Sequence, residues 1–340
     1  MTASLDLPSN RTEGWRWSDL SALPDFTARE PGGLVRPLRD LWIESFRDGP
    51  RLLFVDGALV SEQSNLGTIE IGAVEPEPRD HALARLVGPE GWKLRLGRDH
   101  AAQGIVQIVH ATTGAADHLP AQIELDVDAQ ASIVETFVGH GWTNRLSHFR
   151  LFRGARLMLS RRLLGTSGFV SLTDRVEVGE GASFVAATLA AGGADTRLDG
   201  DIRMAGTSAY AEAAGALLAR GTQRHDANLV IHHAMPNGSS RQLWRSVADD
   251  VKCAHGATVG ELDRNALFYL ASRGVPEDEA KGLLTRAFVA DAIERIGEPA
   301  VKEAFYADVE DWFSQAPLPS GEREGPISHS EATADGRVRV

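Results

Sequence analysis

The chain contains a single cysteine, and a histidine follows it two positions later. Cys253 and His255 lie in the stretch ADDVKCAHGATVGELD, residues 248–263. In an extended strand, residues i and i+2 point to the same face, so a thiolate and an imidazole at this spacing can share a metal or a proton. On a helix they would lie about 200° apart. Gly256 and Gly260 favour extended or turning backbone, so we predict that the pair is able to co-ligate.

Two protein ligands do not make a complete metal site. A structural zinc or an iron–sulfur cluster takes about four ligands, and one cysteine supplies neither a thiolate set nor an internal disulfide. Any metal at Cys253 and His255 must therefore be completed by another chain or by an incoming cluster. The alternative is that Cys253 is a buried structural thiol and His255 a hydrogen-bonded histidine at a turn.

A second group of histidines lies in RHDANLVIHHAMPNGSSRQ, residues 224–242. His225, His232 and His233 allow two interpretations, a three-histidine metal site or structural histidines bonded to backbone carbonyls. The sequence has no phosphate-binding loop, no glycine-rich dinucleotide turn and no H-E-x-x-H motif. We therefore expect no ATP hydrolysis and no enzymatic activity from this chain alone.

The composition is that of a globular protein with an acidic surface. The chain has 340 residues, of which 43% are hydrophobic and 24% charged, and its net charge is −12 at pH 7. This charge opposes binding to nucleic acid or to an anionic membrane. The start, MTASLDLPSNRTEGWRW, lacks the apolar core of a secretion signal, and no run approaches the roughly 18 apolar residues of a membrane span. We expect a cytoplasmic location.

From about Ile105 the sequence repeats a β-type pattern. Small residues recur near Ala131, Ala155, Ala182 and Ser208, a period of roughly 25 residues. Each unit would form one coil of a β-helix, with short strands and tight corners. The alternative is a β-sandwich with evenly spaced turns, but a sandwich usually carries more aromatic core residues than the Ala, Val and Leu found here.

Three helices are predicted after Asp263. The second starts at Pro276, and its spacing predicts one buried face made of Ala280, Leu283, Leu284, Ala287 and Phe288. The third aligns Val301, Phe305, Val309 and Trp312 on one face. Three short helices cannot bury these faces unaided, so they must cover the β array, bind a partner, or both.

These patterns divide the chain into four parts. We expect a mixed, partly helical region over residues 1–100, a β-helix core over 101–262 and a helical region over 263–314. The remaining residues 315–340 are rich in Pro, Gly, Ser and charge, and are predicted to be disordered.

Three stretches of the sequence resemble one known family. The run from Ala248 to Ile293 closely resembles the C-terminal signature of the SufB/SufD family of iron–sulfur cluster assembly proteins. HHAMPNGSSRQLWRSV, residues 232–247, is similar to the family's H-x-x-P-x-x-S-x-Q segment. EGWRWSDLSAL and LLFVDGALV resemble the N-terminal part of the SufD branch, and the single cysteine also favours that branch over the cysteine-richer SufB branch.

The resemblance implies a fold and a role. The fold is a right-handed parallel β-helix flanked by N- and C-terminal helical regions, and the role is that of a non-catalytic scaffold. SufD-like chains pair with a SufB-like chain and with SufC-like ATPase subunits, and the assembly builds a nascent iron–sulfur cluster for carrier proteins. The cluster is then transient, none is bound by the chain alone, and a homodimer is a possible state of the lone chain.

The resemblance also implies site residues. The position of His255 faces the SufB-like partner and takes part in cluster formation, with Cys253 as a further candidate ligand. The C-terminal helices, here roughly residues 265–313, contact the ATPase. The candidate contact residues are Leu267, Phe268, Tyr269, Leu283 and Phe288.

The sequence departs from the family pattern at one point. A strand-rich stretch of several tens of residues normally separates the S-x-Q-x-x-x-x-V segment from A-D-D-V-K-C, whereas Val247 here runs straight into Ala248. We expect the β-helix to be shortened near 247–248 by about two coils. A competing hypothesis for the whole chain is a β-helix enzyme, such as an acyltransferase or a polysaccharide-active enzyme, that uses His232, His233 or His255.

Overall fold

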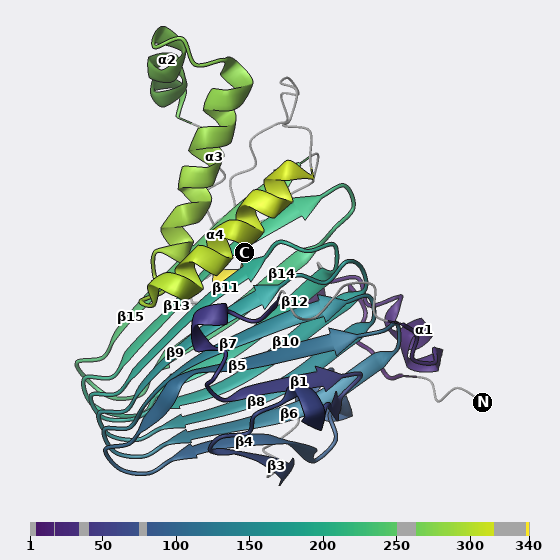
Figure 1. The fold of residues 1–340 in the computed structure, drawn as a ribbon, viewed down its shortest axis with the longest axis vertical. Coiled ribbons are helices and arrows are strands. Elements are labelled where there is room, and N and C mark those ends of the chain that lie inside the picture. Colours follow the sequence, from purple (N-terminus) through teal and green to yellow (C-terminus); the bar gives the residue numbers. More distant parts are fainter. Residues whose placement is uncertain are drawn as a thin grey trace.

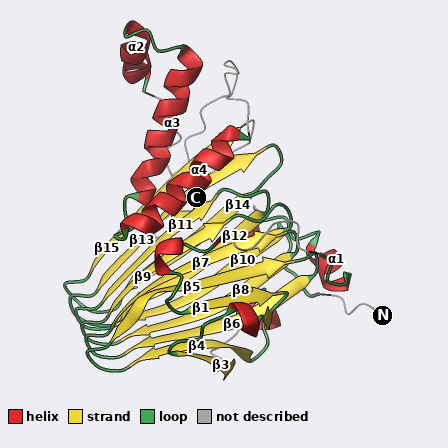
Figure 2. Ribbon diagram, in the orientation of Figure 1, coloured by secondary structure: helices red, strands yellow, loops and turns green. Residues whose placement is uncertain are grey.

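The strands form two facing sheets, each continued coil by coil along the chain (Figures 1 and 2). The computed structural model describes residues 5–16, 18–33, 41–74, 80–249, 263–315 and 338–339. The first sheet has the strand order β15-β13-β11-β9-β7-β5-β1-β2 and the second has the order β16-β14-β12-β10-β8-β6-β4-β3. Successive strands alternate between the sheets from β4 to β15, and their pairings along each sheet are parallel. This is the predicted parallel β-solenoid.

The strands lie mostly between residues 51 and 249. Those of the first sheet are β1 (Arg51–Val55), β2 (Ala58–Leu59), β5 (Ala101–Thr112), β7 (Gln130–Gly139), β9 (Arg156–Leu163), β11 (Ser183–Ala190), β13 (Tyr210–Arg220) and β15 (Ser239–Asp249). Those of the second are β3 (Ile69–Ala73), β4 (Glu90–Leu96), β6 (Ala116–Leu125), β8 (Trp142–Leu151), β10 (Phe169–Val178), β12 (Asp195–Met204), β14 (His225–His233) and β16 (Val338–Arg339). Both sheets therefore already contain strands before residue 101, where we expected the core to begin.

One corner of every coil is made by a residue in the left-handed backbone region. These residues are Asp99, Asp128, Gly154, Gly181, Ser208 and Asn237, with φ between 58° and 69°. In four coils an alanine follows directly and is at most 1% exposed; these are Ala129, Ala155, Ala182 and Ala209. Their intervals are 26, 27 and 27 residues. The repeat was thus predicted correctly in kind, while its period is slightly longer and its first and last small residues lie one or two positions away from those expected.

The core fills the bore between the two sheets. Inward side chains stack on their register partners in the next coil, as Val106, Ile133 and Leu159 do in one sheet and Ile123 and Phe149 do in the other. Such stacking buries a continuous apolar column without requiring large aromatic residues in each coil.

Helix α4 (Pro299–Ser314) lies along the outer face of the first sheet, as Figure 2 shows. Val301, Phe305, Val309 and Trp312 are all at most 5% exposed, which confirms the predicted face. They pack against outward residues of the sheet such as Leu189.

The N-terminal residues cover the outer face of the second sheet. Helix α1 (Leu23–Ala28) and the short 3-10 helices η1 (Glu13–Trp15) and η5 (Ala84–Leu86) belong to this cover. Leu23 and Leu83 pack here against Trp142 and Phe169. Two further 3-10 turns, η3 (Glu44–Phe46) and η4 (Ser61–Gln63), flank β1 and β2.

Helices α2 (Arg264–Ser272) and α3 (Glu277–Ile293) form an arm that projects from the last coils (Figure 1). Asp263 caps α2 by accepting a hydrogen bond from the backbone N–H of Asn265. Gly274, with φ of 83°, follows the C-cap of α2 and begins the turn of the chain toward α3. No helix in the described ranges is both long and apolar enough to cross a membrane.

The buried face of α3 agrees with the predicted one at Ala280, which is 1% exposed, and differs from it further along the helix. Leu283 and Phe288 are 45% and 42% exposed, and the buried residues in the C-terminal half are instead Val289, Ala292 and Ile293. Only this half packs against β13 and β15, while the other half extends beyond the sheet with α2 (Figure 1). Helical spacing predicted that α3 has one apolar face, but which side chains of α3 are buried depends on where the sheet beneath the helix ends.

Candidate partner-binding site

Cys253 and His255 lie outside the described residues, so their geometry is not part of the structure. The two flanks are described. β15, which ends at Asp249, is the last strand of its sheet, and α2 begins at Arg264. In the sequence, the Cys-x-His pair thus lies between the last described strand of the solenoid and the first described helix of the arm.

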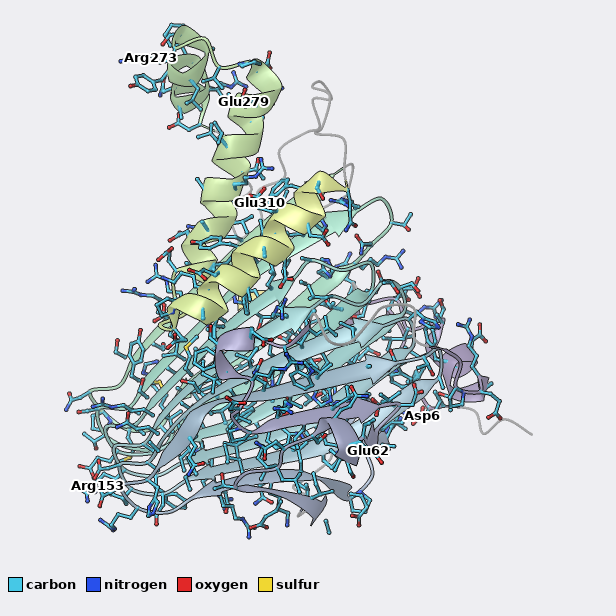
Figure 3. All side chains as sticks on the ribbon, in the orientation of Figure 1. Asp6, Glu62, Arg153, Arg273, Glu279 and Glu310 are labelled. Atoms are coloured by element: carbon cyan, nitrogen blue, oxygen red, sulfur yellow. The ribbon has the colours of Figure 1, made fainter. Side chains whose placement is uncertain are left out.

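The arm carries an apolar surface at its free end. Phe268 is 76% exposed and Tyr269 is 56% exposed on α2, with Leu267 half-buried beside them. The guanidinium of Arg273 lies 5.3 Å from the Tyr269 ring centroid. Figure 3 shows Arg273 at the tip of the arm, away from the solenoid corner that carries Arg153. Large exposed aromatic side chains grouped on one short helix are typical of a protein-binding surface.

Phe288 has a different environment from the tip residues. It lies on the half of α3 that meets the solenoid, and the guanidinium of Arg245 on β15 sits 4.9 Å from its ring centroid. Leu283, at 45% exposure, lies one turn nearer the tip. The five residues predicted as one interface are therefore divided between the tip of the arm and its base.

The base of the arm is anchored to the last two strands of the first sheet. Arg245 of β15 donates to Asp291 of α3 at 2.5 Å. Arg295, just beyond α3, approaches Glu212 of β13 at 3.6 Å. Together with the buried Val289, these contacts fix the direction in which α3 leaves the solenoid, so the tip is held at a defined position.

The three histidines of β14 do not form one site. His225 is half-buried, bonds Thr196 at 2.9 Å and the carbonyl of Leu218 at 3.1 Å, and desolvation of its ring lowers its pKa. His232 and His233 are neighbours on a strand and so point to opposite faces. His232 lies 3.4 Å from Asp201, and His233 bonds Ser240 at 2.9 Å. Only His225 bonds a backbone carbonyl, as the structural interpretation expected, whereas His232 and His233 contact side chains.

One polar cluster was missed by the sequence analysis. His81, before η5, bonds Asp199 on the outer face of β12 through Nε2 at 3.0 Å. Its Nδ1 accepts backbone N–H groups of Leu83 and Ala84 and lies 3.3 Å from the hydroxyl of Thr173. This resembles a hydrolase triad, but Thr173 is 1% exposed and Nδ1 already has donors. The cluster instead ties the N-terminal cover to the solenoid.

That cluster has a clear electrostatic consequence. Despite the opposing effect of burial, hydrogen bonds from His81 and Arg197 hold the pKa of Asp199 at about 2. Arg197 donates to Asp199 at 2.6 Å and 2.7 Å and lies 4.4 Å from the ring centroid of Trp15. No local sequence pattern joins residues so far apart, so only the fold reveals them.

Comparison with known proteins places the chain in a family. The family model described as SUF system FeS cluster assembly, SufBD core domain, matches residues 108–250 and 246–288. SufD of Escherichia coli K12 is 21% identical over 381 aligned positions that cover 89% of this chain and 88% of that protein.

Shorter matches agree. SufD of Bacillus subtilis is 37% identical over 62 residues, which are 18% of this chain and 14% of that protein. A SufBD family protein of Mycobacterium leprae is 35% identical over 83 residues, which are 24% of this chain and 21% of that protein. The two stretches of the family model together cover more than half of this chain. The chain belongs to the SufB/SufD family of iron–sulfur cluster assembly proteins, and within it to the SufD branch.

Proposed function

We propose that this protein is a non-catalytic scaffold subunit of a Suf-type assembly in the cytoplasm, where it pairs with a SufB-like chain and a SufC-like ATPase. The observation that carries the proposal is the arm: α3 is anchored on the solenoid and presents Phe268 and Tyr269 at its tip. Exposed aromatic side chains on a helix pair that is anchored to the solenoid are suited to bind a partner that must transmit force or motion to the solenoid.

We further propose that His255, with Cys253 as a second candidate, contributes to a cluster site completed by the SufB-like chain. The iron–sulfur cluster is then the cargo of the assembly, and this chain alone does not retain it. A ligand set divided between two chains is opened when the chains move apart, which gives a route to cluster release. Where the SufB-like chain is lacking, a homodimer is the expected substitute.

The shortened solenoid remains part of this proposal. The family model matches in two stretches that meet at residues 246–250. About 303 residues of this chain enter the 381-position alignment with E. coli SufD, which leaves about 78 positions without a residue here. At 26 or 27 residues per coil, that difference is at most about three coils. Whole coils are dispensable for folding because each coil contacts only its neighbours.

Co-expression with SufB-like and SufC-like chains tests the proposal. The intact chain should co-purify with both, and the complex should accumulate a cluster with visible absorption after anaerobic reconstitution. The double variant Phe268→Ser, Tyr269→Ser should lose the ATPase and keep the SufB-like chain. Leu66→Ser, which removes an exposed apolar side chain near β3, is the matched control and should change nothing.

The cluster site needs its own variant. His255→Ala should leave complex formation unchanged and lower the cluster yield, whereas His232→Ala should leave both unchanged. Equal cluster yields from His255→Ala and the unaltered chain would refute the role of His255. A chain that folds but co-purifies with neither partner would refute the scaffold assignment as a whole.

A further inference from the structure

Charged side chains line part of the solenoid bore. They come from inward positions of six successive strands, β5 to β10, in both sheets, and replace the apolar stacking found elsewhere. The residues are His110, Asp117, Glu135, Arg145, Arg161 and Asp174. Charges in such a place require partners, because an isolated buried charge is strongly unfavourable.

These residues form one connected chain of contacts. Arg145 donates to Asp117 at 2.5 Å and to Nδ1 of His110 at 3.2 Å. His110 lies stacked between two phenylalanine rings, and its Nε2 is 3.6 Å from Glu135. Arg161 donates to Glu135 at 2.7 Å and to Asp174 at 2.9 Å. The chain crosses from one sheet to the other and ends at Asp174.

The charges in this chain do not balance. Three carboxylates face two guanidinium groups, and burial together with Arg145 lowers the pKa of His110 to about 4, so that it is neutral at pH 7. Arg145 neutralises Asp117. Arg161 must serve both Glu135 and Asp174, which leaves one negative charge without a counter-charge.

Of the two carboxylates that share Arg161, Asp174 is the one that a cation from solvent can reach. Its side chain is 17% exposed, whereas that of Glu135 is 4% exposed. Burial raises the pKa of Asp174 although Arg161 opposes the change. The exposed part faces a hollow at the C-terminal end of the bore, which is also lined by Arg161, Thr188 and Trp244.

Small residues create this hollow. Ala186, Thr188 and Gly200 line it at inward positions where the preceding coil carries the larger Leu159, Arg161 and Asp174. A methyl group on Gly215 would lie 2.2 Å from the ring of Trp244. Trp244 thus lies directly over the glycine as a wall of the hollow. The space open to the centre of a water-sized sphere is about 50 Å³, which limits any occupant to a small group.

The walls favour an organic cation over a metal ion. Leu172, Val176, Phe184 and Trp244 present apolar and aromatic surfaces. Within the described residues, no three His, Cys, Asp or Glu side chains are grouped to hold a metal. A carboxylate at the base of an apolar, partly aromatic hollow is the usual environment of a bound ammonium group.

We propose that this hollow binds a small alkylammonium group, whose charge pairs with Asp174 and whose stem packs against Phe184 and Trp244. The ammonium donates to the carboxylate lone pairs that Arg161 leaves free. A free primary amine and the side chain of a lysine from a docked protein share this chemistry. The inference concerns the bore and is independent of the role proposed for the arm.

Calorimetric titration of the full chain with matched probes tests this site. Propylammonium should bind and raise the melting temperature, while propanol and propionate, which have the same length without the positive charge, should do neither at equal concentration and ionic strength. N-acetyl-lysine methylamide separates the two sources. Binding of both cations supports a site open to lysine side chains, and binding of propylammonium alone supports a free amine.

Two variants locate the binding. Asp174→Asn should weaken propylammonium binding at least about tenfold, whereas Asp201→Asn, on the outer face of the next strand, should leave it unchanged. Thr188→Leu keeps every charge and fills the hollow with a larger side chain, so it should abolish binding. This variant still tests the site if Asp174→Asn does not fold. Equal binding of propanol and propylammonium, or binding that survives Thr188→Leu, would overturn the proposal. The proposal would also fail if the unaltered chain did not bind propylammonium and Asp174→Asn were more stable than it. That result would show that Asp174 is protonated in the folded protein and carries no charge to be paired.

Discussion

Arg162 of β9 and Asp308 of α4 form a bidentate ion pair between the outer face of the first sheet and the helix that covers it. Nε and Nη2 of Arg162 donate to the two carboxylate oxygens at 2.6 Å and 2.8 Å. The side chains are 6% and 9% exposed. Nη1 also donates to the carbonyl of Leu41 at 3.1 Å, so the same guanidinium ties a third segment to the sheet.

Removing one partner of this pair should destabilise the protein strongly. Asp308→Ala leaves the Arg162 guanidinium buried without its counter-charge, and we expect a loss of about 3 kcal/mol in the free energy of unfolding. Urea denaturation followed by circular dichroism measures it. Glu294→Ala, which removes an exposed pairing with Lys302, should cost far less stability than Asp308→Ala. Equal losses in the two variants would contradict the importance of burial here.

The corners of the coils allow backbone strain to be separated from crowding. Gly181 and Gly154 have φ of 58° and 69°. Nothing lies within 4 Å of a methyl group added at Gly181, whereas one added at Gly154 would meet Asp128 Oδ1 at 2.0 Å. Gly181→Ala should therefore cost about 1 kcal/mol from the backbone alone.

Gly154→Ala should cost more than Gly181→Ala, because the Asp128 side chain must also move. Thermal denaturation of the two variants gives the comparison. Ser208→Gly is the converse change: it places glycine at φ of 58° and should be neutral or slightly stabilising. If Gly181→Ala and Gly154→Ala lost the same stability, the close approach of Asp128 would be of no consequence.

The free energy of unfolding should begin to fall already near pH 6.5 as the pH is lowered, before most carboxylates take up protons. The pKa of His110 is lowered to about 4, chiefly by burial, while in the unfolded chain it is near 6.5. Between these values the unfolded state binds the extra proton, so stability falls as the pH falls from about 6.5 to 4. The contribution of His110 is at most about 3 kcal/mol.

Unfolding free energies measured at several pH values test this assignment. His110→Asn should flatten the decline between pH 6.5 and 4, whatever its effect on stability at pH 7. His118, whose pKa burial also lowers to about 4, retains its own contribution in that variant. His100→Asn, which alters an exposed histidine, should leave the slope unchanged. An unaltered slope in His110→Asn would show that this histidine takes up its proton in both states alike.

Local patterns predicted the repeated elements of this fold well. The coil period and the buried face of α4 are visible in the sequence because each depends on neighbours within one strand, turn or helix. The predicted face of α3 was correct at Ala280 but wrong at Leu283, which lies on the half of the helix that passes beyond the sheet. Burial there depends on where the last strand ends, and the spacing of apolar residues within the helix carries no information about that position.

The sites were less predictable than the elements. Phe268 and Tyr269 were named as partner contacts by resemblance; both side chains are exposed, and their role as contacts stays a prediction. The pairing of His81 with Asp199 joins residues 118 positions apart. The charge chain that ends at Asp174 is similarly invisible, because alternate residues of a strand show which side chains are inward but not which inward residues of the facing sheet they meet.

The arm should loosen without the solenoid unfolding when its anchor is removed. Arg245→Ala eliminates both the ion pair with Asp291 and the contact with the Phe288 ring. These side chains are 29% and 41% exposed, so we expect about 1 kcal/mol of local effect, or roughly a fivefold faster amide exchange in α3. Hydrogen exchange followed by mass spectrometry resolves this, with exchange in β7 and β9 as the internal reference. Lys281→Ala, which removes a pairing with Glu277 inside α3, should not loosen the base of the arm. Faster exchange spread equally over the arm and the solenoid would show instead that the two unfold as one unit, and the arm would then not be an independently mounted element.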